Sequence, residues 1–122
     1  MGGARTKKGH VMPSAVFWVV VSCNSAEEAT TIGDQALQAR HAACFDVFPK
    51  QRTRYFWPPT KGTIEEGNGA LLVLETLEDH LAPLTAMIRA HHSDALPFIG
   101  ALRLEHVDER VRNWIAGELE AP

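Results

Sequence analysis

The sequence predicts a single α+β domain: a ferredoxin-like βαββαβ sandwich with an added helix at its C-terminal end. Three observations support this fold class. The length of 122 residues suggests one domain. Patterns typical of strands and helices follow one another as strand, helix, strand, strand, helix, strand and a last helix. Two β-α-β halves in succession build one four-stranded sheet with two helices on one face.

The first half begins with a buried strand and a capped helix. "AVFWVVVS" at residues 15–22 is β-branched and apolar without alternation, which is typical of a central strand covered on both faces. In "NSAEEATTIGDQALQAR" at residues 24–40, Ser25 and Glu28 fit a capping box, and Arg40 closes the last turn. The apolar face of this helix consists of Ala29, Ile32, Ala36 and Leu37.

The middle of the chain predicts a long edge strand, a turn and a second buried strand. "AACFDVFPKQRTRYFW" at residues 42–57 is aromatic and β-prone, and Pro49 interrupts it, so we expect a bent edge strand. Residues 58–69 carry turn chemistry, with an extended conformation possible at residues 63–64. "ALLVLET" at residues 70–76 is almost entirely aliphatic and predicts the third strand.

The second half repeats the order and adds a helix. Residues 77–92 have leucine and isoleucine at helical spacing, and Pro83 is tolerated only near the first turn. "FIGALRLE" at residues 98–105 predicts the fourth strand. Asp108 can cap a final helix over residues 109–119. The expected stripe of that helix is formed by Val111, Trp114, Ile115 and Glu118.

This pattern leaves one face of the sheet uncovered. The first and third strands are apolar at successive positions, so both faces of the sheet require cover, yet the helices cover only one. Because a large exposed apolar sheet face is rare in a monomer, a second copy of the chain is its natural cover. The sequence therefore predicts an oligomer.

Composition excludes several classes of protein. The net charge of -3 argues against a nucleic-acid partner. The longest apolar run, residues 15–21, is too short to cross a membrane, and no signal cleavage site follows it, so we expect a cytoplasmic protein. Residues 1–12 are expected to form a disordered leader or tail before a domain at residues 13–120. Cys23 and Cys44 are expected at opposite ends of the sheet, which is too far for a disulfide.

Several short motifs occur in a characteristic order along residues 15–119, namely "SAEEA", "ALLVLET", "HHSDALPFI" and "NWI". The most specific motif is "AAC", ending at Cys44, followed by Tyr55 and Trp57. In this order and spacing they resemble the motifs of the CutA family, the divalent-cation tolerance proteins, of which this chain is identified as a divergent member. This resemblance implies a ferredoxin-like protomer, a homotrimer with its sheets packed inward, and an association with copper and other divalent metals.

The chain departs from the family pattern after the second half's helix. Family members usually read His-Pro-Tyr-(acid or Gln)-x-Pro-Glu at this point. This chain keeps His92 and Pro97 and lacks the tyrosine and the glutamate. The Lys-Thr that often ends the third strand is Glu75-Thr76 here. A polar pocket built from the family's tyrosine, glutamate and lysine is therefore altered.

The candidate metal ligands are Cys44, His92 and Asp94. Adjacent helical residues point about 100° apart, so His91 and His92 cannot share an ion on a helix. If the backbone is extended at His92, its side chain and that of Asp94 lie on one side, and a trimer supplies further ligands across a subunit cleft. Cys44 is the softest donor and suits Cu(I). The alternatives are a histidine bonded to helix-end carbonyls, a turn aspartate and a small buried cysteine.

Two functions compete. The first is a non-enzymatic trimer of metal homeostasis that responds to metal ions and holds copper, another divalent ion or a small ligand between subunits. The alternative is a signalling module resembling the PII trimers, with a small molecule or nucleotide between subunits. Tyr55 and Trp57 are the expected ligand-binding residues at the subunit junction. An enzyme is not expected, because the sequence shows no nucleophile elbow, no His-x-x-x-His and no convincing carboxylate pair.

Overall fold

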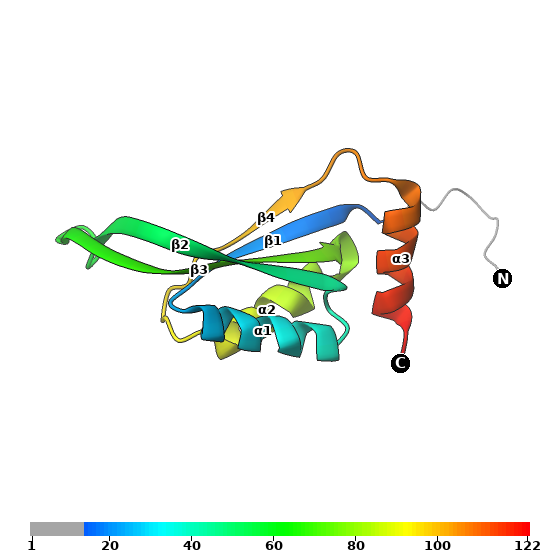
Figure 1. Cartoon of the computed structure of the whole chain (residues 1–122), viewed down its shortest axis with the longest axis horizontal. Coiled ribbons are helices and arrows are strands. Elements are labelled where there is room, and N and C mark those ends of the chain that lie inside the picture. Colours follow the sequence, from blue (N-terminus) through cyan, green and yellow to red (C-terminus); the bar gives the residue numbers. More distant parts are fainter. Residues whose placement is uncertain (1–13) are drawn as a thin grey trace.

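A computed structural model describes residues 14–122, and the prediction for residues 1–12 lies outside this range. Figure 1 shows one sheet with α1 and α2 against one face and α3 across one end. The elements in chain order are β1 (Val16–Cys23), α1 (Ala26–Gln38), β2 (Cys44–Trp57), β3 (Thr63–Leu77), a 3-10 turn η1 (Glu78–His80), α2 (Leu81–His91), β4 (Ile99–Arg103) and α3 (Glu109–Glu120).

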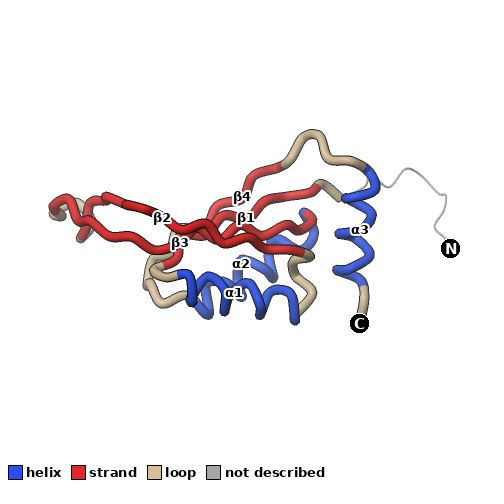
Figure 2. Tube along the Cα trace, in the orientation of Figure 1, coloured by secondary structure: helices blue, strands red, loops and turns tan. Residues whose placement is uncertain are grey.

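The sheet has the strand order β2-β3-β1-β4, with every neighbouring pair antiparallel. Each half contributes one central and one edge strand, and Figure 2 shows the two layers of strands and helices. Together with the helices on one face, this order confirms the predicted ferredoxin-like sandwich with its added helix.

The predicted helix caps are present, one of them in a shifted form. Ser25 Oγ accepts a hydrogen bond from the Glu28 amide at 3.0 Å, as in a capping box. The Glu28 carboxylate, however, accepts from the amide of Asn24 at 2.9 Å, one residue before the cap. Asp108 caps α3 by accepting from the Arg110 amide at 2.8 Å. Pro83 lies near the start of α2, where a missing amide proton costs little.

β3 begins at Thr63, seven residues before the predicted start at Ala70. The glycine-rich segment read as a turn pairs instead with the far end of β2, from Thr53↔Gly67 to Trp57↔Thr63, across a bulge. Here a partner strand overrides local propensity. Gly69 has φ +136°, and a Cβ there would lie 2.3 Å from the carbonyl oxygen of Cys23, so only glycine allows this close approach.

The core lies between the sheet and the two helices, with a smaller cluster under α3. The main cluster includes Val19, Val21, Ile32, Leu72, Leu74, Leu84 and Ile88, which are all fully buried. In the smaller cluster, Ile115 and Leu119 of α3 contact Val16 and Leu77. The predicted stripe is therefore partly wrong: Val111 and Trp114 are exposed. α3 packs across the end of the sheet through Ile115 and Leu119, and Val111 and Trp114 lie outside this contact.

The opposite face of the sheet carries large apolar side chains that no helix covers within residues 14–122. Trp18, Phe48 and Leu102 are 39%, 52% and 55% exposed on this bare face. This is the face for which the sequence predicts a second copy, and that oligomer stays a prediction. No helix of the described residues is long and apolar enough to cross a membrane.

Candidate functional site

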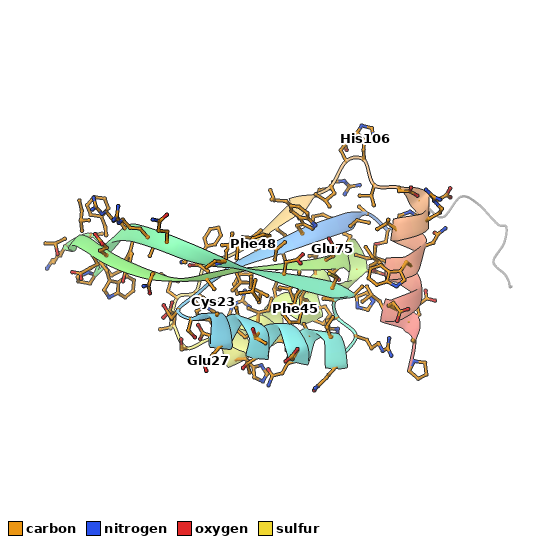
Figure 3. All side chains as sticks on the ribbon, in the orientation of Figure 1. Cys23, Glu27, Phe45, Phe48, Glu75 and His106 are labelled. Carbon is orange, nitrogen blue, oxygen red and sulfur yellow. The ribbon has the colours of Figure 1, made fainter. Side chains whose placement is uncertain are left out.

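Three side chains with metal-binding chemistry converge where β1 ends, α1 begins and α2 ends. They are Cys23, the last residue of β1, Glu28 in the first turn of α1, and His92, which follows α2. One ligand atom from each lies within 4.8 Å of the others. Figure 3 labels Cys23 at this junction, beside the start of α1. The group combines a thiol, a carboxylate and an imidazole.

His92 is buried and uses both ring nitrogens. Its backbone is extended, with φ -81° and ψ 143°. Nε2 donates to the carbonyl oxygen of Ser22 at 2.7 Å, and Nδ1 accepts from the amide of Asp94 at 3.0 Å. These partners specify the neutral tautomer with its proton on Nε2. The predicted alternative, a bond to helix-end carbonyls, is not what the ring makes, because Ser22 belongs to β1. These bonds nevertheless give His92 a structural role, and an ion at either nitrogen must replace one of them.

Asp94 lies on the same side as His92, as an extended backbone predicts. Its Oδ2 is 4.0 Å from His92 Nδ1, and about half of its side chain is exposed. Oδ1 accepts a hydrogen bond from the Asn24 side chain at 2.9 Å. Two of the three predicted metal ligands are thus neighbours, and Asp94 is held by the loop that follows β1.

Glu28 is positioned and kept ionised by backbone donors. Its two oxygens accept from the amides of Asn24, at 2.9 Å, and Ser93, at 2.8 Å. Burial opposes ionisation, but these hydrogen bonds outweigh it and lower the pKa of Glu28. Oε1 lies 4.0 Å from His92 Nε2. A carboxylate that is already charged is ready to receive a cation without losing a proton.

Cys23 is the opposite case, because its thiol is held protonated. Only 1% of the residue is exposed. Burial, and then the negative charge of Glu28, raise the pKa of Cys23 to about 11, against an opposing effect of Lys50. At neutral pH the sulfur therefore carries its proton, and a metal ion must displace it to bind the thiolate.

Cys44, the third predicted ligand, is not near His92 within one protomer. The register aligns Cys44 with Glu75 and Glu75 with Trp18, five residues before Cys23 along β1. At about 3.3 Å per residue the two cysteines lie roughly 16 Å apart along the strands. Both are free, so the predicted absence of a bridge between them is confirmed. Burial and the charges of Glu75 and Asp46 raise the pKa of Cys44.

Sequence reasoning missed Cys23 and Glu28 as partners of His92. The signal that could have found them is the topology. β1 and β4 are antiparallel, so the C-terminal end of β1 lies beside the segment that leads from α2 into β4. The hydrogen bond from the Ser22 amide to the Phe98 carbonyl, at 3.2 Å, joins these two parts of the chain. Sequence patterns alone predict Cys23 at the end of a strand and Glu28 in a helix cap, and neither position indicates a metal ligand.

The predicted ligand-binding residues Tyr55 and Trp57 line a groove of about 520 Å³. Its walls are the outer part of the β2–β3 hairpin and the loop before β4, and they include Asp94 and Phe98. Tyr55 and Trp57 are 48% and 47% exposed. The structure thus brings these aromatics to the same groove as Asp94, and away from Cys44.

The chain matches the family model of the CutA1 divalent ion tolerance protein over residues 17–118. It is 30% identical over 98 residues to the protein CutA homolog of Danio rerio, covering 80% of this chain and 63% of that protein. It is 27% identical over 103 residues to the divalent-cation tolerance protein CutA of Archaeoglobus fulgidus, covering 84% of this chain and 97% of that protein. The chain thus spans less than two thirds of the Danio rerio relative and nearly all of the archaeal one.

Solved structures agree with this match. The periplasmic divalent cation tolerance protein CutA of Archaeoglobus fulgidus superposes with a TM-score of 0.80 at 26% identity, over 86% of this chain and 99% of that one. CutA of Xylella fastidiosa gives a TM-score of 0.81 at 25% identity, over 88% of this chain and 100% of that one. The chain belongs to the CutA1 divalent ion tolerance protein family.

Proposed function

We propose that this chain is a non-catalytic, trimeric binding protein of the cytoplasm that serves tolerance to divalent metals, copper above all. Family membership supports the role in metal tolerance. The observation that carries metal binding by this chain is the convergence of Cys23, Glu28 and His92 within 4.8 Å. These three residues form the proposed metal site, and Asp94 lies beside His92 on its Nδ1 side.

The donor set favours a soft or borderline ion. A thiolate and an imidazole suit copper and zinc, whereas calcium and magnesium prefer oxygen ligands. The residues fit such an ion in number as well, because three protein ligands leave one position for a fourth donor. Asp94 Oδ2 faces Nδ1 at 4.0 Å, whereas Glu28 Oε1 faces Nε2 at 4.0 Å, so in this arrangement the fourth donor is water or another group rather than Asp94.

The buried thiol and the bonded imidazole set the conditions for binding. The proton of Cys23 must leave, because its pKa is raised to about 11. An ion at His92 Nε2 replaces the hydrogen bond to Ser22. Both changes cost free energy, so we expect binding that tightens as the pH rises and that depends on a high-affinity ion such as copper.

The proposed trimer rests on the bare sheet face. Trp18, Phe48 and Leu102 expose apolar surface there, and three copies packed sheet to sheet would bury it. Cys44 lies on this face beside Glu75. In the proposed trimer Cys44 therefore reaches an ion only at a contact between copies, separately from the site at Cys23.

The proposed metal site is tested by titrating Cu(I) into the wild-type protein and into two matched cysteine variants. In competition with a chromophoric chelator, Cys23→Ser should weaken Cu(I) binding at least tenfold. Cys44→Ser should leave it within twofold. Equal binding by all three proteins, or a loss confined to Cys44→Ser, would overturn the proposed site.

The groove at Tyr55 and Trp57 favours a second candidate, a PII-like module that binds a small molecule or nucleotide. Two aromatic side chains offer stacking surfaces, and Lys50, which also lines the groove and donates to Ser22 Oγ at 2.6 Å, adds a positive charge. A thermal-shift screen of nucleotides tests it. A rise in melting temperature that is lost in Trp57→Ala supports this function, and no rise with any nucleotide contradicts it.

A further inference from the structure

Two histidines meet at the other end of the sheet, far from the proposed metal site. His41 lies in the connection from α1 to β2, and His80 lies in the connection from β3 to α2. Because the start of β2 pairs with the end of β3, at Cys44↔Glu75, both connections leave the sheet at the same end. The ring centroids of His41 and His80 are 6.0 Å apart, with the planes inclined at 55°.

The backbone of His41 is fixed on both sides. Its amide donates to the carbonyl of Ala36 at 3.0 Å, which closes the C-terminal turn of α1. Arg40, with φ +59°, supplies the left-handed residue that this turn needs. The carbonyl of His41 accepts from Thr76 Oγ1 at 2.7 Å. These hydrogen bonds hold the backbone of His41, and hence the attachment point of its imidazole, in one position.

One ring nitrogen of His41 has no hydrogen-bond partner within the described part of the chain. Nδ1 of His41 is buried and makes no hydrogen bond to any group in residues 14–122. A buried polar atom without a partner typically costs about 1–3 kcal/mol, and such atoms often mark a bound water or ion. The imidazole of His80, whose ring centroid lies 6.0 Å from that of His41, offers a second nitrogen ligand beside it.

We propose that His41 and His80 form a second cation site, selective for borderline divalent ions that prefer imidazole, such as Ni²⁺, Zn²⁺ and Cu²⁺. A zinc–nitrogen bond is about 2.0–2.1 Å, and a ring nitrogen lies about 1.2 Å from its ring centre. Two histidines that share an ion therefore have centroids about 5.3 Å apart in tetrahedral geometry and about 6.5 Å apart when they are trans to each other. The observed 6.0 Å lies between these two values. Water completes the coordination, because His41 and His80 as whole residues are only partly buried, although Nδ1 of His41 itself is enclosed.

This histidine pair differs from the proposed metal site in chemistry and in place. It has no sulfur, so it does not select Cu(I), and its affinities follow the usual order of divalent ions with Cu²⁺ strongest. It lies at the Cys44 end of the strands, whereas Cys23 lies five residues along β1 from that end. The two sites can therefore bind ions independently, and a substitution that abolishes binding at one need not affect the other.

The test uses the full chain with Cys23→Ser and His92→Gln, so that the proposed metal site is silent. Ni²⁺ is titrated calorimetrically into this background. We expect one site per chain, and at least tenfold weaker binding after His80→Gln or His41→Gln. His106→Gln is the matched control, because His106 is exposed and projects from the loop between β4 and α3 (Figure 3). That variant should bind as the background does.

Two readouts separate ligation from a merely structural role. Cu²⁺ loaded into the background should show nitrogen hyperfine structure from two imidazoles in its electron paramagnetic resonance spectrum, and from one after His80→Gln. Ni²⁺ should raise the melting temperature of the background and not of His80→Gln. Equal Ni²⁺ binding in the His80, His41 and His106 variants, or no Ni²⁺ binding by the background, would overturn the proposal and leave a buried water as the partner of Nδ1.

Discussion

His92 donates from Nε2 to the carbonyl oxygen of Ser22 at 2.7 Å and thereby joins the end of α2 to the end of β1. The two residues are seventy positions apart in the chain, so this bond closes a long loop. The bond is buried, because the side chain of His92 is fully enclosed. His92 consequently has a structural role whether or not it binds a metal ion.

Replacing His92 should separate these two roles. His92→Ala leaves the carbonyl of Ser22 and the amide of Asp94 unpaired and creates a cavity, so we expect a loss of about 2–4 kcal/mol in the free energy of unfolding. His92→Gln can still donate to Ser22 and should retain more of that stability while losing Cu(I) affinity. Urea unfolding and chelator competition measure the two effects.

His91 provides the control for this pair of variants. His91 is exposed, and among residues 14–122 its ring bonds only to the carbonyl of Met87 within its own helix, at 2.9 Å. His91→Ala should change the free energy of unfolding by no more than about 0.5 kcal/mol. A His92→Gln variant that keeps wild-type Cu(I) affinity would exclude His92 as a ligand.

The thiol of Cys23 should make stability depend on alkaline pH. The pKa of Cys23 is raised from 9.0 to about 11 in the folded protein, so the folded state holds its proton more tightly than the unfolded state does. The protonated thiol therefore contributes to the free energy of unfolding. This contribution is fully present below pH 9 and is lost as the pH rises to about 11, a loss of at most about 2–3 kcal/mol. Chemical unfolding at several pH values measures it.

Cys23→Ala removes the titrating group and should flatten this part of the pH profile. Cys44→Ala is the comparison, since Cys44 is only partly buried and belongs to the bare face. If the wild type and Cys23→Ala lose the same stability between pH 9 and pH 11, the proton on Cys23 is not held by the fold.

Gly33 lies where α1 packs tightly on Phe45 of the sheet. A Cβ at this position would lie 2.6 Å from the ring of Phe45, so the ring or the helix must shift. Gly33→Ala should therefore destabilise the protein by about 1–3 kcal/mol, despite the better helix propensity of alanine. Thermal and urea unfolding measure the change.

Gly117 in α3 is the matched control, because a Cβ there meets no atom within 4 Å in the described structure. Gly117→Ala should stabilise the protein by about 0.5–1 kcal/mol through helix propensity alone. Were Gly33→Ala as stabilising as Gly117→Ala, the contact between α1 and Phe45 would be looser than described.

The bare sheet face should control the oligomeric state. Leu102 is 55% exposed in the protomer, so Leu102→Asp should leave the protomer folded and break the proposed trimer. Light scattering should give three times the chain mass of 13.4 kDa for the wild type and a lower mass for this variant. Ala86→Asp, at an exposed position of α2 on the helical side, should keep the wild-type mass. A monomeric wild type would contradict the proposed assembly.

The sequence predicts the fold better than the site, for physical reasons. Strands such as β1 and helices such as α1 follow from local patterns, namely a continuous apolar run and a cap at Ser25. The start of β3 could not be placed, because Gly67 and Gly69 are poor strand residues that pair only when β2 is alongside. Which side of α3 is buried is decided by its contact with the end of the sheet, at Val16 and Leu77, and not by the apolar pattern of the helix itself.

The metal site illustrates the same limit. His92 and Asp94 are close in sequence, and the extended backbone that brings them together could be anticipated. Cys23 and Glu28 join them only through the packing of β1, α1 and the segment after α2. Cys44 matched a family motif, but the register of β2 on β3 places it on another face and at another end.

X-ray absorption at the copper edge of Cu(I)-loaded Cys44→Ser protein tests the central proposal most directly. In this variant Cys23 is the only thiol left in the chain. The proposed site predicts one sulfur neighbour of copper together with nitrogen or oxygen neighbours, and loss of the sulfur signal when Cys23 is also changed to serine. A copper environment without sulfur in the Cys44→Ser protein would contradict it.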